Sequence, residues 1–250
     1  MAIITYSNEE QAEGYPDNQD LFEKKPVGFY GDDGLLSPYS NIFYWSRIWT
    51  VTGTEMTDNS YKGFEIFIFV LFGRIEYYDN KYKGWKSLSA GDIFLIKSGN
   101  GIINSLRLSP DSSFIQIWTD PNLEKSLNQP ATSEIFPSES FPLTIEKNRS
   151  TKIYKGNGSP VVMQTEGLVI KEVSMAAGTH VLDCKKDIFL SGFVIEGDLR
   201  IRASTLSSND FFIAKEEESI NISTETDCRL LVAESPLEPE YPTYAGNYKF

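Results

Sequence analysis

Histidine is almost absent from this sequence, and that scarcity limits the chemistry the chain can perform. Its single histidine, His180, rules out a three-histidine metal site within one chain. A Ser-His-Asp triad would have to use His180, and no Gly-x-Ser-x-Gly nucleophile elbow accompanies it. Cysteine is also rare, since Cys184 and Cys228 are the only two and neither forms a Cys-x-x-Cys pair. The sequence therefore holds no zinc knuckle, and it gives no support for a disulfide between them.

Positive charge is the second deficit. The chain has 23 Lys and Arg against 35 Asp and Glu, a net charge of −12. Nucleic-acid and anionic-membrane partners need clustered positive charge, so we expect neither. The sequence shows no signal-peptide pattern and no apolar run long enough to span a bilayer. We expect a cytoplasmic protein whose partner is a small organic ligand, and a protein partner stays open.

Short apolar runs separated by Gly, Asn, Asp and Ser turns fill the chain. Examples are Ile42–Val51, Phe64–Phe72, Ile93–Lys97, Phe114–Trp118, Leu168–Val173, Ile188–Ile195, Phe211–Ala214 and Leu230–Val232. These runs have strand length, and no long helical periodicity interrupts them. The pattern predicts an all-β fold of the sandwich or barrel kind.

An internal repeat predicts two similar barrels in tandem. The segment Leu88–Lys97, LSAGDIFLIK, recurs as Leu206–Lys215, LSSNDFFIAK, and an apolar run ending in glycine precedes each copy. A stretch rich in Pro and Ser separates the two halves and reads as a linker. We therefore predict an N-terminal barrel over 1–128, a linker over 129–145, a C-terminal barrel over 146–233 and an extended tail over 234–250.

Several blocks of the sequence form a set in a fixed order. In the first half these are GFEIFIFVLFGRIEYYDN, LSAGDIFLIKSGNGIINS and FIQIWTDP, and the second half adds GSPV, LSSNDFFIA and ESPLEP. Together these blocks resemble the pirin family of bicupins, with ESPLEP similar to the family's closing segment. The resemblance runs from about Phe43 to the C-terminus. It implies two tandem cupin-type β-barrels, a bicupin.

The resemblance also implies a metal site whose ligands are replaced in this chain. The family's His-x-His pair falls on Asn59 and Tyr61, and its His-x-Glu pair falls on Asn104 and Leu106. Iron would find no imidazole there. We therefore predict no metal and no cofactor. The family's metal-dependent activities, such as quercetin dioxygenation, and its iron-dependent coregulator role do not carry over.

The second barrel offers no replacement site in the sequence. Its corresponding positions fall near Asp183 and Lys185, which supply no histidine. The favoured interpretation of His180 is a surface histidine. A metal site built from His180, Asp183 and Cys184 is a remote alternative.

Strand alternation predicts which residues line the altered pocket. If the register is unbroken, Asn59, Tyr61, Glu65, Phe67 and Phe69 face together into the first barrel. A bulge at Gly63 would break that register. Three further ligand-binding candidates would face them: Asn104, Leu106 and Gln116. Such a cavity, apolar and aromatic with a few polar groups, is typical of a small-molecule site.

Glu65 and Tyr61 are the catalytic candidates. A carboxylate in an apolar barrel should have a raised pKa and could act as a general acid or base. Tyr61 and Asn104 could donate hydrogen bonds to a developing oxyanion. The competing interpretation is that Glu65 points outward or pairs with a lysine, and that Tyr61 fills the space left by the metal.

Three functions follow from these observations. The first is a pirin-like protein that binds a small organic ligand in its N-terminal barrel, with metal- and O2-independent isomerase, cyclase or lyase chemistry if it is an enzyme. The second is a non-catalytic interaction module, which predicts a first barrel filled by its own side chains. A metal-dependent dioxygenase is a distant third.

Overall fold

The computed structural model describes residues 2–14, 19–30 and 35–247. The chain forms two compact units, each built from more than one stretch of sequence. The N-terminal barrel unit comprises Ala12–Ser140, Met163–Glu166 and Glu240–Phe250. The C-terminal barrel unit comprises Met1–Gln11, Phe141–Val162 and Gly167–Pro239.

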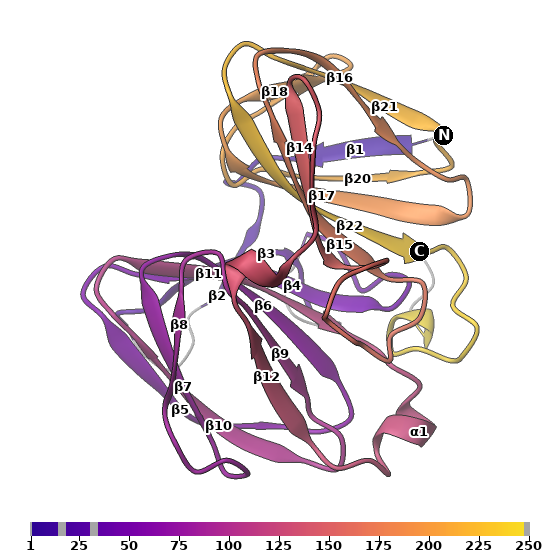
Figure 1. Cartoon of the computed structure of the whole chain (residues 1–250). Helices are drawn as coiled ribbons and strands as arrows, with labels where there is room; N and C mark the ends of the chain where they lie inside the picture. Colours follow the sequence, from indigo (N-terminus) through magenta and orange to yellow (C-terminus); the bar gives the residue numbers. More distant parts are fainter. Residues whose placement is uncertain (1, 15–18, 31–34, 248–250) are drawn as a thin grey trace. The chain divides into compact units, whose positions relative to one another are not determined.

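The N-terminal barrel unit consists of two antiparallel sheets (Figure 1). The larger has the order β12-β9-β6-β11-β4-β3-β2, and the smaller has the order β5-β10-β7-β8. The strands of the larger sheet are β2 (Ala12–Gly14), β3 (Phe22–Val27), β4 (Ile42–Thr50), β6 (Glu65–Phe72), β9 (Ile93–Lys97), β11 (Ser112–Thr119) and β12 (Thr132–Phe136). Those of the smaller are β5 (Thr54–Tyr61), β7 (Arg74–Asp79), β8 (Lys86–Ser89) and β10 (Ile102–Leu108).

The C-terminal barrel unit repeats this plan. Its larger sheet has the order β1-β20-β17-β22-β15-β14-β13, and its smaller sheet has the order β16-β21-β18-β19. The larger sheet contains β1 (Ala2–Tyr6), β13 (Leu143–Ile145), β14 (Arg149–Lys155), β15 (Val169–Met175), β17 (Ile188–Glu196), β20 (Phe211–Lys215) and β22 (Cys228–Pro236). The smaller contains β16 (Gly178–Asp183), β18 (Leu199–Ile201), β19 (Ser204–Leu206) and β21 (Ser219–Thr224).

In the part of the chain that the structure describes, helical structure is limited to short pieces. These are α1 (Leu123–Ser126) and two 3-10 turns, η1 (Ser138–Ser140) and η2 (Ala245–Asn247). Over the described ranges, no helix is long and apolar enough to cross a membrane. The predicted all-β fold with two tandem barrels is confirmed.

The structure confirms the internal repeat: the two copies have the same strand–turn–strand structure. Each copy is a strand, a tight turn and a second strand, β8–β9 in the first and β19–β20 in the second. Gly91 and Asn209 occupy the same place with positive φ values of 89° and 76°. The aspartate that follows accepts a backbone hydrogen bond, from Ser89 N to Asp92 at 2.8 Å and from Ser207 N to Asp210 at 2.7 Å. Gly adopts this backbone conformation without steric cost and Asn tolerates it better than most residues, which explains the exchange.

The structure divides the chain differently from the predicted boundaries. β1 pairs with β20, so the first residues lie in the C-terminal barrel unit rather than in a barrel over 1–128. The predicted linker over 129–145 contains β12, which pairs with β9. β22 continues to Pro236, past the predicted barrel end at 233. These strands are short or interrupted by Pro and Ser, so their pairing depends on distant partners rather than on local pattern.

Each pair of sheets encloses its own core. In the C-terminal barrel unit the core is mainly apolar, and Phe212 lies across Gly192 of the neighbouring strand. A Cβ atom on Gly192 would lie 2.2 Å from the Phe212 ring, so only glycine fits beneath it. The Phe212 ring thus occupies the space that a side chain at position 192 would need. In the N-terminal barrel unit, buried polar side chains, among them Asn104 and Gln116, adjoin the apolar core.

Candidate functional site

The chain turns sharply between β5 and β6, and this turn decides which residues enter the N-terminal barrel. β5 belongs to the smaller sheet and β6 to the larger, with Gly63 between them at a φ of +87°. On β6 the core residues are Ile66, Ile68 and Val70. Because side chains alternate along a strand, the odd-numbered residues of β6 face the other way.

The predicted register was therefore wrong for three residues. Glu65, Phe67 and Phe69 lie on the face of β6 opposite the barrel core, where all three are buried. The bend at Gly63 breaks the alternation that connects them to Asn59 and Tyr61. They do not line a site with those residues.

The other predicted residues do meet inside the barrel. Asn59 and Asn104 are direct ladder partners on β5 and β10. Tyr61 packs against the core that contains Leu106, and its ring meets that of Trp118 edge-on at 4.9 Å. Gln116 is buried beside them. Its amide donates to Ser46 Oγ at 3.1 Å and accepts from Trp118 Nε1 at 2.9 Å. Five of the eight predicted site residues thus share one interior.

The carboxylate that accompanies them is Glu23 on β3, which sequence reasoning missed. Glu23 is 7% exposed, and Tyr44 Oη donates a hydrogen bond to it. Its ladder partner is Gly14, and a Cβ atom there would lie 2.0 Å from the carboxylate. The glycine therefore makes room for this acid. β3 reads FEKKPV, a charged segment with a proline, so no strand pattern marked it.

Burial controls the ionisation of Tyr61. Burial, and then the negative charge of Glu23, raise the pKa of Tyr61 well above that of an ordinary phenol. The side chain stays an O–H donor at neutral pH. A proton donor thus lies within electrostatic reach of a buried carboxylate.

Aromatic rings cover this end of the barrel. Phe29 stacks on Tyr44 at a centroid distance of 4.6 Å and meets Trp118 edge-on at 5.6 Å. Tyr44 and Trp118 lie 5.3 Å apart. With Tyr61, these rings form an apolar wall around the polar groups, as in many small-molecule sites.

Two amide groups in this interior lack partners. Asn59 Nδ2 and Asn104 Nδ2 are buried, and neither donates a hydrogen bond within the described residues. A buried donor left unsatisfied costs about 1–3 kcal/mol. The two residues are direct ladder partners, so their side chains lie next to each other on the same face of the sheet.

The donor set at the family's ligand positions does not fit a metal ion. Leu106 has no donor atom, Tyr61 stays protonated, and Asn59 and Asn104 offer only amides. Imidazole, thiolate or carboxylate ligands are needed for a stable site of a transition metal. Across 2–14, 19–30 and 35–247, no three His, Cys, Asp or Glu residues lie close enough to hold a metal.

Glu65 has a structural environment instead of a catalytic one. Gln164 N donates to its Oε1 at 2.7 Å, while Thr165 N and Thr165 Oγ1 donate to its Oε2 at 2.9 and 2.7 Å. The side chain is 2% exposed. Glu65 therefore anchors the segment Met163–Glu166 to the N-terminal barrel unit, and both of its oxygens are occupied in doing so.

Asp120 anchors a second remote segment, the C-terminal tail. Tyr244 N donates to its Oδ2 at 2.7 Å, and Tyr241 Oη donates to its backbone carbonyl at 2.7 Å. Burial raises the pKa of Asp120 to about 7, although backbone hydrogen bonds from Tyr244 and Ala245 oppose the rise. Asp120 Oδ1 has no partner among the residues that the structure describes.

The remote metal site in the second barrel is not assembled. His180 is buried at 6% exposure, so the expected surface histidine is corrected, and its Nε2 lies 2.8 Å from Ala176 O. Its strand packs it inward, while Asp183 is exposed. Cys184 and Cys228 are free thiols.

Comparison with known proteins identifies the fold. No family model matches the sequence, and no curated protein matches it. Solved structures do match. The bacterial pirin YhhW of Escherichia coli, in complex with nickel(II), has a TM-score of 0.75 at 16% identity, covering 94% of this chain and 99% of that one.

Two further structures agree. GK1651 of Geobacillus kaustophilus has a TM-score of 0.75 at 16% identity, covering 97% of each chain. Quercetin 2,3-dioxygenase of Acinetobacter baumannii has a TM-score of 0.74 at 16% identity, covering 93% of this chain and 86% of that one. The chain therefore has the bicupin fold, and its arrangement is pirin-like.

Proposed function

We propose that the N-terminal barrel binds a small, uncharged organic molecule without the help of a metal ion. The observation that carries this proposal is the pair of unpartnered amide donors on Asn59 and Asn104. They lie at the positions where the resembling family holds its metal. An acceptor such as a carbonyl oxygen would satisfy both donors at once.

The surroundings favour a ligand that is flat and carries hydroxyl groups. The rings of Tyr44, Tyr61 and Trp118 provide an aromatic wall. Glu23 adds a buried acceptor that an O–H donor of the ligand would meet. A negatively charged ligand would be repelled by the same carboxylate, which is why the proposal specifies an uncharged one.

The enzymatic form of the proposal moves the acid–base role from Glu65 to Glu23. Glu23 is the carboxylate that faces Tyr61, and the protonated Tyr61 would donate to a developing oxyanion. Such a pair supports proton transfer within one substrate, as in an isomerisation or cyclisation. The nickel(II) of YhhW and the dioxygenase activity named for the Acinetobacter protein have no donor set here to support them.

The second candidate is a protein-interaction module, which requires the first barrel to be filled by its own side chains. One observation favours it: buried apolar side chains form a continuous cluster inside the N-terminal barrel. The two candidates differ in whether that barrel has room for a ligand, and the binding experiment below separates them.

Quercetin is a suitable probe, since it is flat, carries a ketone oxygen and several hydroxyls, and names one of the structural neighbours. We expect isothermal titration calorimetry to show saturable binding at one site per chain. Asn104→Leu should abolish it, because the hydrophobic side chain removes a donor. Asn221→Leu, on an exposed position of β21 in the other unit, is the matched control and should leave binding unchanged. Binding that survives Asn104→Leu would contradict the proposal.

A further inference from the structure

A cleft lies in the C-terminal barrel unit, and none of the residues of the site described above lines it. It has a volume of about 430 Å³, which is the size of a small-molecule site. Its walls are the hairpin between β13 and β14 and the ends of β14, β15, β17 and β22. The function proposed for the N-terminal barrel does not use it.

Four polar side chains form a row along one side of this cleft. Ser150, Ser174, Arg229 and Glu196 are successive ladder partners on four neighbouring strands. Partners across an antiparallel ladder place their side chains on the same face. Within the described residues, neither serine hydroxyl makes a hydrogen bond, so both can bind a ligand.

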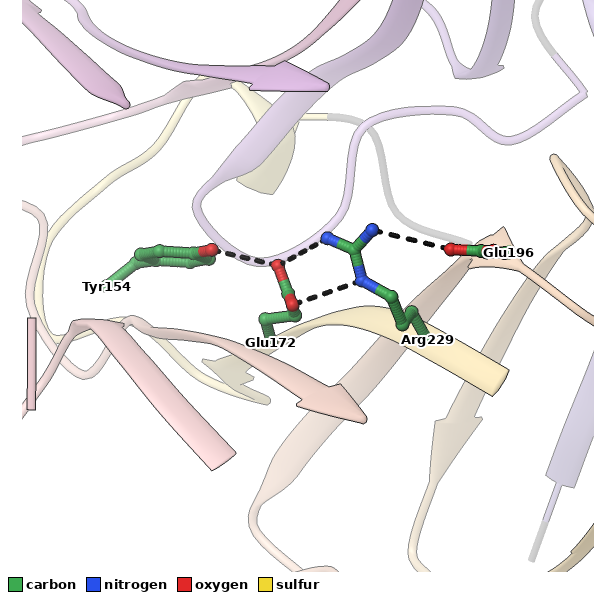
Figure 2. Close-up of polar contacts among 4 residues, drawn as sticks. All are labelled: Tyr154, Glu172, Glu196 and Arg229. Atoms are coloured by element: carbon green, nitrogen blue, oxygen red, sulfur yellow. Dashed lines mark hydrogen bonds and ion pairs between the residues drawn. The ribbon is translucent and has the colours of Figure 1, made fainter. Parts of the chain in front are cut away.

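Arg229 is held rigidly along one edge. Figure 2 shows Glu172 between Tyr154 and the guanidinium. Arg229 Nε donates to Glu172 Oε1 and Nη2 donates to Oε2, both at 3.2 Å, while Tyr154 Oη donates to Oε2 at 2.8 Å. Burial, and then the charge of Glu172, raise the pKa of Tyr154, so it stays a hydrogen-bond donor. This buried support fixes the plane of the guanidinium.

The opposite edge of the guanidinium is held loosely. Among the described residues, the one partner of Nη1 is Glu196, at 3.5 Å (Figure 2). The Glu196 side chain is 69% exposed. An exposed ion pair of this length contributes little. A ligand carboxylate that binds bidentately to Arg229 would replace it at small cost.

The charges around the cleft match a molecule that carries both signs. Lys147, Arg149 and Arg229 supply three positive charges, and Glu146, Glu196 and Asp227 supply three negative ones. Arg149 pairs with Glu146 at 2.9 Å. A simple anion would meet the repulsion of Glu196 and Asp227, whereas an ammonium group would be attracted to them.

We propose that this cleft binds a small zwitterion of the amino acid class. The carboxylate replaces Glu196 on the loosely held edge of Arg229 and accepts hydrogen bonds from the hydroxyls of Ser150 and Ser174. The ammonium group lies toward Glu196 and Asp227. This proposal does not depend on the function proposed for the N-terminal barrel. It concerns binding only, and the ligand undergoes no reaction.

The test is a thermal-shift screen of the full chain against each protein amino acid in turn, followed by calorimetry with the best binder. Acetate and methylammonium serve as single-charge probes. A ligand that binds only the folded state raises the melting temperature. We expect at least one amino acid to do so while acetate and methylammonium do not. No shift with any amino acid, or an equal shift with acetate, overturns the proposal.

Two variants locate the binding. Arg229→Lys keeps the charge but loses the planar edge, and it should lower the affinity by about tenfold or more. Ser174→Ala removes one hydroxyl that has no structural partner, and it should lower the affinity about two- to tenfold even if Arg229→Lys fails to fold. Arg202→Lys, at another arginine of the same unit that pairs with Glu217, is the control and should change nothing. Affinity unchanged in Ser174→Ala overturns the placement.

Discussion

Replacing Asn104 with leucine should make the protein more stable while it removes ligand binding. The Asn104 side chain is 1% exposed, and its Nδ2 donor has no partner in the part of the chain that the structure describes. Leucine has a similar branched shape, brings no polar atom and would join Leu106 in the core. Removing an unsatisfied buried donor should raise the free energy of unfolding by about 1–3 kcal/mol.

Urea unfolding of the two proteins, followed by Trp fluorescence, measures this difference. Asn59→Leu should act in the same direction, and the double variant should show less than the sum, because the residues are in contact. The matched control is Asn41→Leu, since Asn41 is also buried but its Nδ2 donates to Glu166 O at 2.8 Å. That variant should be less stable than the wild type. If Asn104→Leu also has a lower free energy of unfolding than the wild type, the Asn104 amide contributes to stability and the prediction is wrong.

Three further variants test other parts of the account. Glu65→Gln should lower the melting temperature, because Thr165 loses a charged hydrogen-bond acceptor. The affinity for quercetin should stay the same. If this variant lost quercetin binding but kept its stability, Glu65 would again be a candidate site residue. Asp120 has a folded pKa of about 7 against an ordinary value of 3.8, so its contribution is full below pH 4 and is lost as pH rises through 7. Asp120→Asn should therefore flatten the pH dependence of stability over that window, as calorimetry can show. Gly192→Ala should lower the free energy of unfolding by about 1–3 kcal/mol, since the new methyl group strikes the Phe212 ring. Equal stability of the two proteins in urea would contradict this close packing.

The fold could be predicted from the sequence because short apolar strands and their turns are marked by residues that lie close together in the chain. In each copy of the strand–turn–strand repeat, a residue with positive φ precedes an aspartate. These residues are Gly91 and Asn209. Such a turn can be recognised without knowing its partners. The pairing of β1 with β20 could not be recognised, because five residues carry no signal about a partner more than two hundred positions away.

The site was only partly predictable, for a geometric reason. The alternation of side chains along β5 and along β10 predicted the inward side of Asn59, Tyr61 and Asn104, because alternation holds within a single strand. The same count failed at Glu65, because the chain changes sheets at Gly63. Glu23 stayed hidden because its strand is highly charged, and only the space above Gly14 explains its burial.

The claim that the N-terminal barrel binds an organic molecule without a metal is tested most directly by one titration. Quercetin should be titrated by calorimetry into the protein before and after dialysis against EDTA. We expect the same affinity and the same stoichiometry in both experiments. Binding that disappears with EDTA and returns with nickel(II) or iron(II) would contradict it.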